Sequence, residues 1–397
     1  TVLFDLDDTL LSTNMDRFLP GYFKALSTAL SHLGPAGKIT QRIHTAVNHM
    51  VANQDPNQTL KEVFDNHFYA PLGTTEEACR KTIQAFYQND YPHLKPITQP
   101  KAPAKQLVNW CLSQGMRIAI ATNPLFPQSA TRQRIEWAGL KPDDFDFFTT
   151  YDDFHFTKPH LVYYAEVLGR LGWPQEMVAM VGDNLPYDLL PMDTMGYPTF
   201  WINDNLHGVR WESGTLSEVK PWLNQVMGDE ISPLPDDPEV HIAILRATPA
   251  VIDTWLRQIH ADQITENKFP QDNDFNQTLS HLAVLEFKVF QPLWESILNE
   301  PTKSLPSLGE LKPFGQDFDK LINPQEEYNC FLKNRLTSLD IIDELYQNQF
   351  FNHKEHLARS DNISAKAVLR LISDHDRNSL QKLANFHNCS GSPAAKS

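Results

Sequence analysis

The stretch VLFDLDDTLL, residues 2–11, decides how the rest of the chain is interpreted. It opens with a short apolar run that is typical of a buried strand, and the carboxylates of Asp5, Asp7 and Asp8 follow directly. Clustered carboxylates repel one another and lose hydration at the end of a buried strand, so they are costly unless a partner binds them. The stretch therefore predicts a strand that delivers acidic side chains to a binding site.

Strand-like and helical patterns alternate further along the chain. Four later apolar runs are predicted to be strands: 116–123, 147–151, 177–184 and 198–202. The segments between them have helical spacing and include 102–115, 128–140 and 160–172. Such alternation is typical of an α/β fold, in which a parallel sheet is covered by helices on both faces.

The patterns also divide the chain into parts, as 397 residues allow. Apolar residues recur at helical spacing in a long insertion and again in four amphipathic stretches near the end of the chain, which predict an all-α four-helix bundle. We therefore expect an α/β domain at 1–227 with a helical insertion at about 13–95, a Pro- and Asp-rich linker at 228–238, a helical bundle at 239–388 and a disordered tail at 389–397.

Composition and charge narrow the class of protein. The hydrophobic fraction of 41% and the charged fraction of 21% are those of an ordinary globular protein. The net charge of −15 argues against affinity for nucleic acid or anionic membranes. No apolar run reaches the roughly 18 residues of a membrane span, and no signal peptide is evident. The four scattered cysteines suggest reduced thiols, so we expect a cytoplasmic protein.

Polar side chains from four segments are expected to meet at one edge of the predicted sheet. In an open parallel sheet, ligands bind at the carboxyl ends of the strands. The candidates there are Asp5, Asp7, Thr122, Asn123, Lys158, Asp183 and Asp188. Carboxylate oxygens are the ligands that suit Mg²⁺, which also bridges to phosphate, and a carboxylate beside it can act as a nucleophile.

These residues carry a resemblance to a known family. Residues 5–9, Asp-Leu-Asp-Asp-Thr, match the motif DxDx(T/V) of the haloacid dehalogenase (HAD) superfamily. The other three motifs of that family match an apolar strand ending in Thr122, the pair Lys158-Pro159, and Gly182-Asp183 with Asp188. Each motif alone is a weak signal, but all four occur in order at predicted strand ends. Residues 1–227 therefore resemble a HAD hydrolase with a Rossmann-like core, and the insertion resembles its C1-type helical cap.

The resemblance implies a reaction and a role for each residue. Asp5 would attack a phosphoryl group and form an aspartyl-phosphate, and Asp7 would protonate the leaving oxygen and then activate water. Thr122, Asn123 and Lys158 would hold the phosphoryl oxygens, with backbone N–H groups at a helix start after Asn123. The implied ligands of Mg²⁺ are Asp5, Asp7 through its carbonyl, Asp183 and Asp188. The implied activity is Mg²⁺-dependent hydrolysis of a small phosphorylated metabolite.

The C-terminal part resembles a second family and leaves alternatives open. Residues 240–388 resemble DinB-like four-helix bundles, which often bind a metal through three histidines. His281 and His375 match two of them, but Ser379 stands at the third position. His375 is thus either a ligand or a core histidine, and the bundle is a structural, dimerisation or partner-binding module. An interaction protein with a non-catalytic HAD scaffold is the alternative function.

Overall fold

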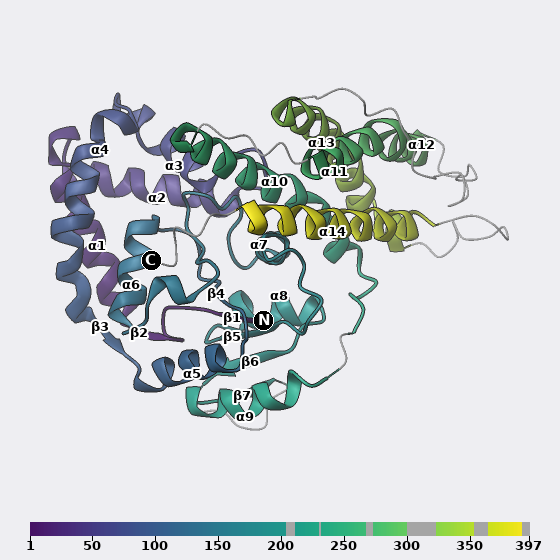
Figure 1. The fold of residues 1–397 in the computed structure, drawn as a ribbon. Coiled ribbons are helices and arrows are strands. Elements are labelled where there is room, and N and C mark those ends of the chain that lie inside the picture. The colour runs from purple at the N-terminus through teal and green to yellow at the C-terminus, as the bar shows by residue number, and fades with distance from the viewer. Residues whose placement is uncertain (204–210, 230–231, 267–272, 300–322, 353–363, 391–397) are drawn as a thin grey trace. The chain divides into compact units, whose positions relative to one another are not determined.

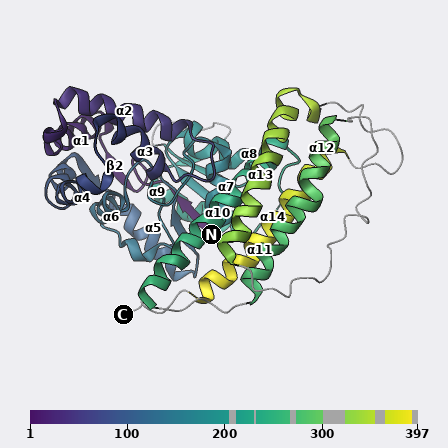
Figure 2. The same cartoon turned by 90° about the horizontal axis from the view of Figure 1, so that it is seen from above.

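The computed structural model describes residues 1–203, 211–229, 232–266, 273–299, 323–352 and 364–390. The chain forms two compact units (Figures 1 and 2). The first unit comprises Thr1–Tyr164 and Gln175–Leu234, and the second comprises Ala165–Pro174 and Pro235–Ser397. In the described residues, no helix is both long enough and apolar enough to cross a membrane.

A five-stranded parallel sheet in the order β4-β1-β5-β6-β7 organises the first unit (Figure 1). Its strands are β1 (Val2–Phe4), β4 (Ile118–Ile120), β5 (Ala179–Gly182), β6 (Thr199–Ile202) and β7 (Glu212–Gly214). All residues of β1, β4 and β5 are buried, because these strands have neighbours on both sides or helices over their faces. The parallel sheet predicted from the sequence is confirmed.

Helices connect the parallel strands of the first unit. The helices between strands of the sheet are α5 (Ala102–Ser113), α6 (Gln128–Trp137), α7 (Leu161–Arg170) and α8 (Leu190–Thr194), and α7 continues into the second unit from Ala165. The helix α9 (Leu216–Val226) follows the last strand. α9 begins with a capping box in which Thr215 and Glu218 satisfy each other's backbone N–H groups. Neighbouring parallel strands need long crossover connections, which explains why helical segments lie between the apolar runs.

A helical segment is inserted between β2 (Leu11–Thr13) and β3 (Thr98–Pro100), which pair antiparallel. Its helices are α1 (Met15–Ala29), α2 (Ala36–Ala52), α3 (Leu60–Phe68) and α4 (Glu76–Ala85). Phe18, Tyr22 and Leu26 recur every four residues and form the buried face of α1. The long helical pattern that the sequence places at about 13–95 is thus present.

The second unit is helical. Its helices are α10 (Pro238–Glu266), α11 (Asn273–Leu285), α12 (Gln291–Asn299), α13 (Pro324–Gln347) and α14 (Ala365–Ser390). α11, α13 and α14 run alongside one another (Figure 2). The buried guanidinium of Arg335 pairs with the buried carboxylates of Glu286 and Asp376 and joins three helical segments. Residues 391–397 of the predicted disordered tail lie outside the described residues. The same is true of residues 230–231 of the predicted linker.

One predicted strand is absent and one observed strand was not predicted. Residues 147–151 form no strand, because Phe148 makes only a single parallel bridge to Ile120 before the chain turns away. The sheet instead gains β7 at its edge, where the short polar sequence Glu-Ser-Gly has no apolar alternation that would predict a strand.

Candidate active site

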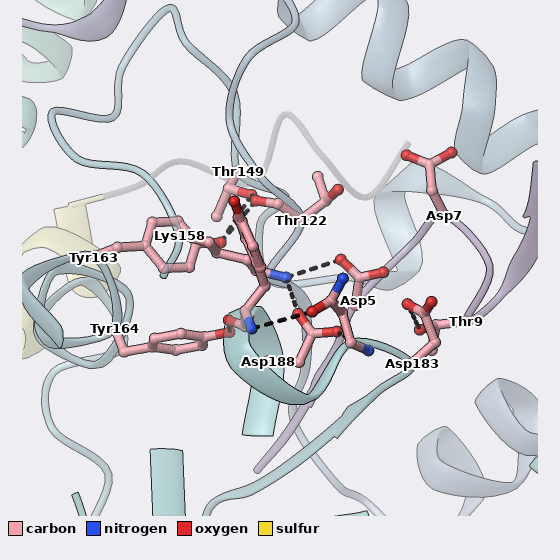
Figure 3. A network of polar contacts seen from close by, with 12 residues as sticks. Asp5, Asp7, Thr9, Thr122, Thr149, Lys158, Tyr163, Tyr164, Asp183 and Asp188 are labelled. Carbon is pink, nitrogen blue, oxygen red and sulfur yellow. Dashed lines mark hydrogen bonds and ion pairs between the residues drawn. The ribbon is translucent and has the colours of Figure 1, made fainter. Parts of the chain in front are cut away.

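Three carboxylates converge at the carboxyl ends of β1 and β5 (Figure 3). Phe4 and Val181 are paired in the sheet, so Asp5 and Asp183 leave neighbouring strands at the same edge. Asp188 joins them from the turn Leu185–Leu189. One oxygen from each carboxylate lies within 4.8 Å of the others, and this is the one such group of three that the described part of the chain contains. The sequence prediction that these carboxylates meet is thereby confirmed.

The crowding has an electrostatic cost. Burial, together with the charges of Asp5 and Asp188, raises the pKa of Asp183 to about 7. Burial also raises the pKa of Asp188 to about 6, although Lys158 opposes the shift. A bound cation would relieve this repulsion. The donors are all carboxylate oxygens, a set that fits Mg²⁺ and does not favour softer metals.

Lys158 lies at the centre of the site and is buried. Its ammonium donates to Asp5 Oδ1 at 2.8 Å and to Asp188 Oδ1 at 2.6 Å (Figure 3). Burial acts to lower the pKa of Lys158, but the charges of Asp188 and Asp5 outweigh it and raise this pKa well above its ordinary value. Lys158 lies three residues before α7, which starts at Leu161. The lysine is thus charged and placed by the carboxylates that it contacts.

Thr122 and Asn123 follow β4 and border the same site. The carbonyl of Thr122 accepts hydrogen bonds from Thr149 Oγ1 at 2.5 Å and from the Tyr163 hydroxyl at 2.7 Å, which fixes the backbone (Figure 3). Asn123 Oδ1 is buried without a hydrogen-bond partner. A helix was expected to start directly after Asn123, and this prediction was wrong. The helix α6 begins only at Gln128, because the loop before it contains two prolines. The N–H groups that follow Asn123 therefore belong to a loop.

Asp7 lies beside the three carboxylates without joining them. Its carboxylate points away from Asp5 (Figure 3), accepts a hydrogen bond from Thr13 Oγ1 at 2.8 Å and pairs with the Arg134 guanidinium. Burial raises the pKa of Asp7, although Arg134 acts to lower it. Asp8 accepts the Thr13 N–H at 2.9 Å, so its side chain holds the backbone of β2.

Three residues of the site were missed by the sequence analysis. Arg134 is buried on α6 and pairs with Asp7. Trp201 Nε1 donates to the Asp183 carbonyl at 2.7 Å, and Thr9 Oγ1 donates to Asp183 Oδ1 at 3.3 Å. Two of them left a signal. Thr9 is the threonine of the motif DxDx(T/V), and Arg134 is a charged residue on the helix face that also carries Ala130 and Thr131. Trp201 was counted as an apolar strand residue, and nothing in its sequence pattern indicates the bond to Asp183.

The histidine pair of the second unit forms no comparable cluster. The ring centroids of His281 and His375 are 5.4 Å apart. His375 Nδ1 is buried without a partner, and burial lowers the pKa of His375 to about 4. Within the described residues, no third His, Cys, Asp or Glu atom completes a three-ligand group with them.

Comparisons with known proteins find the family whose motifs the site contains. A family model described as haloacid dehalogenase-like hydrolase matches residues 1–194, which contain all four motifs. The pyrophosphatase PpaX of Bacillus cereus (strain AH820) is 26% identical over 217 residues, which cover 52% of this chain and 85% of that protein. PpaX of Bacillus mycoides (strain KBAB4) is 25% identical over 241 residues, covering 57% and 98%.

Solved structures also match a little over half of the chain. The HAD phosphatase from Thermococcus onnurineus is 22% identical, with a TM-score of 0.36, and covers 58% of this chain and 98% of that one. YfnB from Bacillus subtilis, solved bound to magnesium, is 23% identical, with a TM-score of 0.36, and covers 56% and 97%. On the family model and the geometry of its motifs, residues 1–194 belong to the haloacid dehalogenase-like hydrolases.

Proposed function

We propose that the chain is a Mg²⁺-dependent phosphatase that hydrolyses a small phosphorylated metabolite through an aspartyl-phosphate. The observation that carries the proposal is the group of Asp5, Asp183 and Asp188 beside the buried ammonium of Lys158. A scaffold without catalysis would have no need to crowd three mutually repelling carboxylates, two of them buried, so this group disfavours the alternative of a non-catalytic interaction protein. The relatives named pyrophosphatase and phosphatase also support phosphoric ester or anhydride chemistry.

The nucleophile in this proposal is Asp5. Its carboxylate is buried at the end of β1, and Lys158 holds one oxygen, Oδ1, so that the orientation of the group is fixed. Attack on phosphorus forms the Asp5–phosphoryl bond and breaks the bond to the leaving oxygen. Mg²⁺ held by Asp5, Asp183 and Asp188, and by the Asp7 carbonyl, would supply positive charge beside the phosphoryl oxygens.

The other residues would bind the phosphoryl group and move the proton. Lys158, Thr122 and Asn123 border the site, and Asn123 Oδ1 has no hydrogen-bond partner of its own. They would hold the phosphoryl oxygens, whose charge spreads in the transition state. Asp7 would give a proton to the leaving oxygen and later take one from the water that breaks the aspartyl-phosphate.

The remaining parts of the proposal concern the rest of the chain. We assign the helices between β2 and β3 to a C1-type cap, residues 228–238 to a linker and residues 239–388 to a DinB-like four-helix bundle that forms a homodimer or binds a protein partner. The helical content of both parts supports these assignments. We also propose a cytoplasmic location and no nucleic-acid or membrane binding, which the charge of −15 and the free thiols of Cys79, Cys111 and Cys330 support.

Turnover of p-nitrophenyl phosphate and of pyrophosphate tests the proposal. The purified chain should release phosphate from at least one of them with Mg²⁺, lose this activity in excess EDTA and regain it when Mg²⁺ is restored. Full activity in EDTA would contradict the metal requirement. No turnover of these compounds, or of a panel of phosphorylated metabolites, would favour the interaction protein instead.

A further inference from the structure

Arg134 is a fully buried cation, with 1% of its side chain exposed. Burying a guanidinium costs several kcal/mol unless it is paired and hydrogen-bonded. One terminal nitrogen pairs with Asp7 Oδ2, and the other donates to Thr131 Oγ1 at 3.4 Å, while Nε has no partner. The Asp7 carboxylate is thus the charge that compensates Arg134 inside the first unit.

The guanidinium is also held by aromatic rings. It lies over the ring of Phe126, 4.4 Å from the centroid, in a cation–π contact. Phe126 in turn packs edge-on against Phe18 and Tyr22 of α1, with centroids 6.3 Å and 5.2 Å away. The loop before α6 and the first inserted helix therefore fix the position of Arg134.

Each oxygen of the Asp7 carboxylate therefore accepts from its own donor, and the position of each donor is fixed. Thr13 Oγ1 donates to Oδ1 at 2.8 Å, and Arg134 binds Oδ2. The carboxylate thereby stands apart from the group formed by Asp5, Lys158 and Asp188 (Figure 3). A rigid, charged donor of this kind sets both the direction and the distance of the carboxylate that it binds.

We propose that Arg134 is the positioning residue of Asp7, which keeps the Asp7 carboxyl aligned with the leaving oxygen of the substrate. The inference rests on the proposed function, since it needs Asp7 to transfer the proton. In this inference Arg134 acts on the reaction only through Asp7. Its loss should therefore impair the two proton transfers in which Asp7 takes part.

The experiment compares a poor leaving group with a good one. Phenyl phosphate needs the Asp7 proton more than p-nitrophenyl phosphate does, because p-nitrophenolate is the more stable anion. A positioned acid contributes about a hundredfold or more in rate. Arg134→Met should therefore lower kcat/KM for phenyl phosphate about a hundredfold, and for p-nitrophenyl phosphate less than about tenfold. Arg134→Lys, which keeps the charge, should recover part of the loss.

Arg132→Met is the control. Arg132 is 43% exposed on the same helix, so replacing it should leave both values of kcat/KM within about twofold.

A double-mutant cycle shows whether Arg134 acts through Asp7. In an Asp7→Asn background, Arg134→Met should change kcat/KM by less than about threefold. Equal losses for both substrates, the same loss in the Asp7→Asn background, or no loss at all would overturn the inference.

Thermal melting provides a readout that does not depend on activity. Arg134→Met leaves the partly buried Asp7 carboxylate without its ion-pair partner, so it should lower the melting temperature, and adding Asp7→Asn should raise it again. Additive losses in the double variant would overturn the pairing on which the inference depends. A wild-type chain without any phosphatase turnover would instead overturn the proposed function, and this inference with it.

Discussion

At the scale of single residues, repulsion among carboxylates governs the site. Burial and the neighbouring acids raise the pKa of Asp183 to about 7 and that of Asp188 to about 6. In the unfolded chain these groups titrate near 3.8. Between these values the folded, metal-free chain binds more protons than the unfolded chain, so its stability falls as the pH rises through this window. Mg²⁺ and protons should compete for the same oxygens.

The increase in melting temperature caused by saturating Mg²⁺ measures this competition. The increase should be small at about pH 5.5, where protons already neutralise the carboxylates, and should grow up to about pH 8. Asp183→Asn removes one of the titrating groups and should weaken both the increase and its pH dependence. The same Mg²⁺-induced increase at both pH values, or none at either, would contradict this description of the site.

At the scale of elements, the end of β5 leaves no room for a side chain. A Cβ atom on Gly182 would lie 2.4 Å from Asp188 Oδ2 and 2.5 Å from Asp188 Cβ and Cγ. The turn that follows β5 therefore folds back closely enough to bring Asp188 to Lys158. The glycine of the fourth motif is explained by this close approach.

Gly182→Ala tests that explanation. The added methyl must push Asp188 away, so the Mg²⁺ concentration for half-maximal activity should rise about tenfold or more, and stability should fall by about 1–3 kcal/mol. Gly37→Ala is the matched control, because a Cβ there meets nothing within 4 Å and lies in the helix α2. The control should be neutral or stabilising by about 0.5–1 kcal/mol in chemical denaturation. If Gly182→Ala behaves like the control, the turn is not fixed by this contact.

Sequence patterns predicted the elements that have strong local signals. The short apolar run before Asp5 indicates β1, and the helical periodicity of its apolar residues indicates α14. The edge strand β7 does not, because its short polar sequence depends on pairing with β6. The partnership of Arg134 with Asp7 was also not predictable, since 127 residues separate them and only the folded chain brings them together.

At the scale of the whole molecule, the second unit is not one continuous stretch. It includes Ala165–Pro174, which the sequence places inside the hydrolase segment. Within this unit, Arg170 donates to Thr254 Oγ1 at 2.7 Å, and Arg377 lies over the ring of Trp173 at 5.0 Å. A Cβ on Gly172 would lie 2.7 Å from the Cβ of Ala384, so the backbone approaches α14 closely. A cut at the predicted linker therefore removes partners of residues 165–174.

A chain that ends at Leu234 should consequently melt at a lower temperature than the full chain and aggregate more readily. The expected loss arises because Trp173 and Arg170 lose their packing partners on α10 and α14. The full chain with a protease site inserted at 230–231 is the control, since both parts remain present after cleavage. Equal melting temperatures and activities for the truncated and intact chains would show that residues 1–234 fold independently.

The central claim is that Asp5 is the nucleophile, that Lys158 orients it and that Mg²⁺ supplies positive charge beside it. Replacing Asp5 tests this claim most directly. Asp5→Asn keeps the size of the side chain and removes the attacking anion. Phosphate release from the substrate that the wild type turns over fastest should fall about a thousandfold or more, which corresponds to roughly 4 kcal/mol in the barrier. Asp8→Asn is the control, because the Asp8 side chain accepts the Thr13 N–H and is not in the carboxylate group, and it should stay within about tenfold of the wild type. A folded Asp5→Asn protein with near-wild-type turnover would contradict the account.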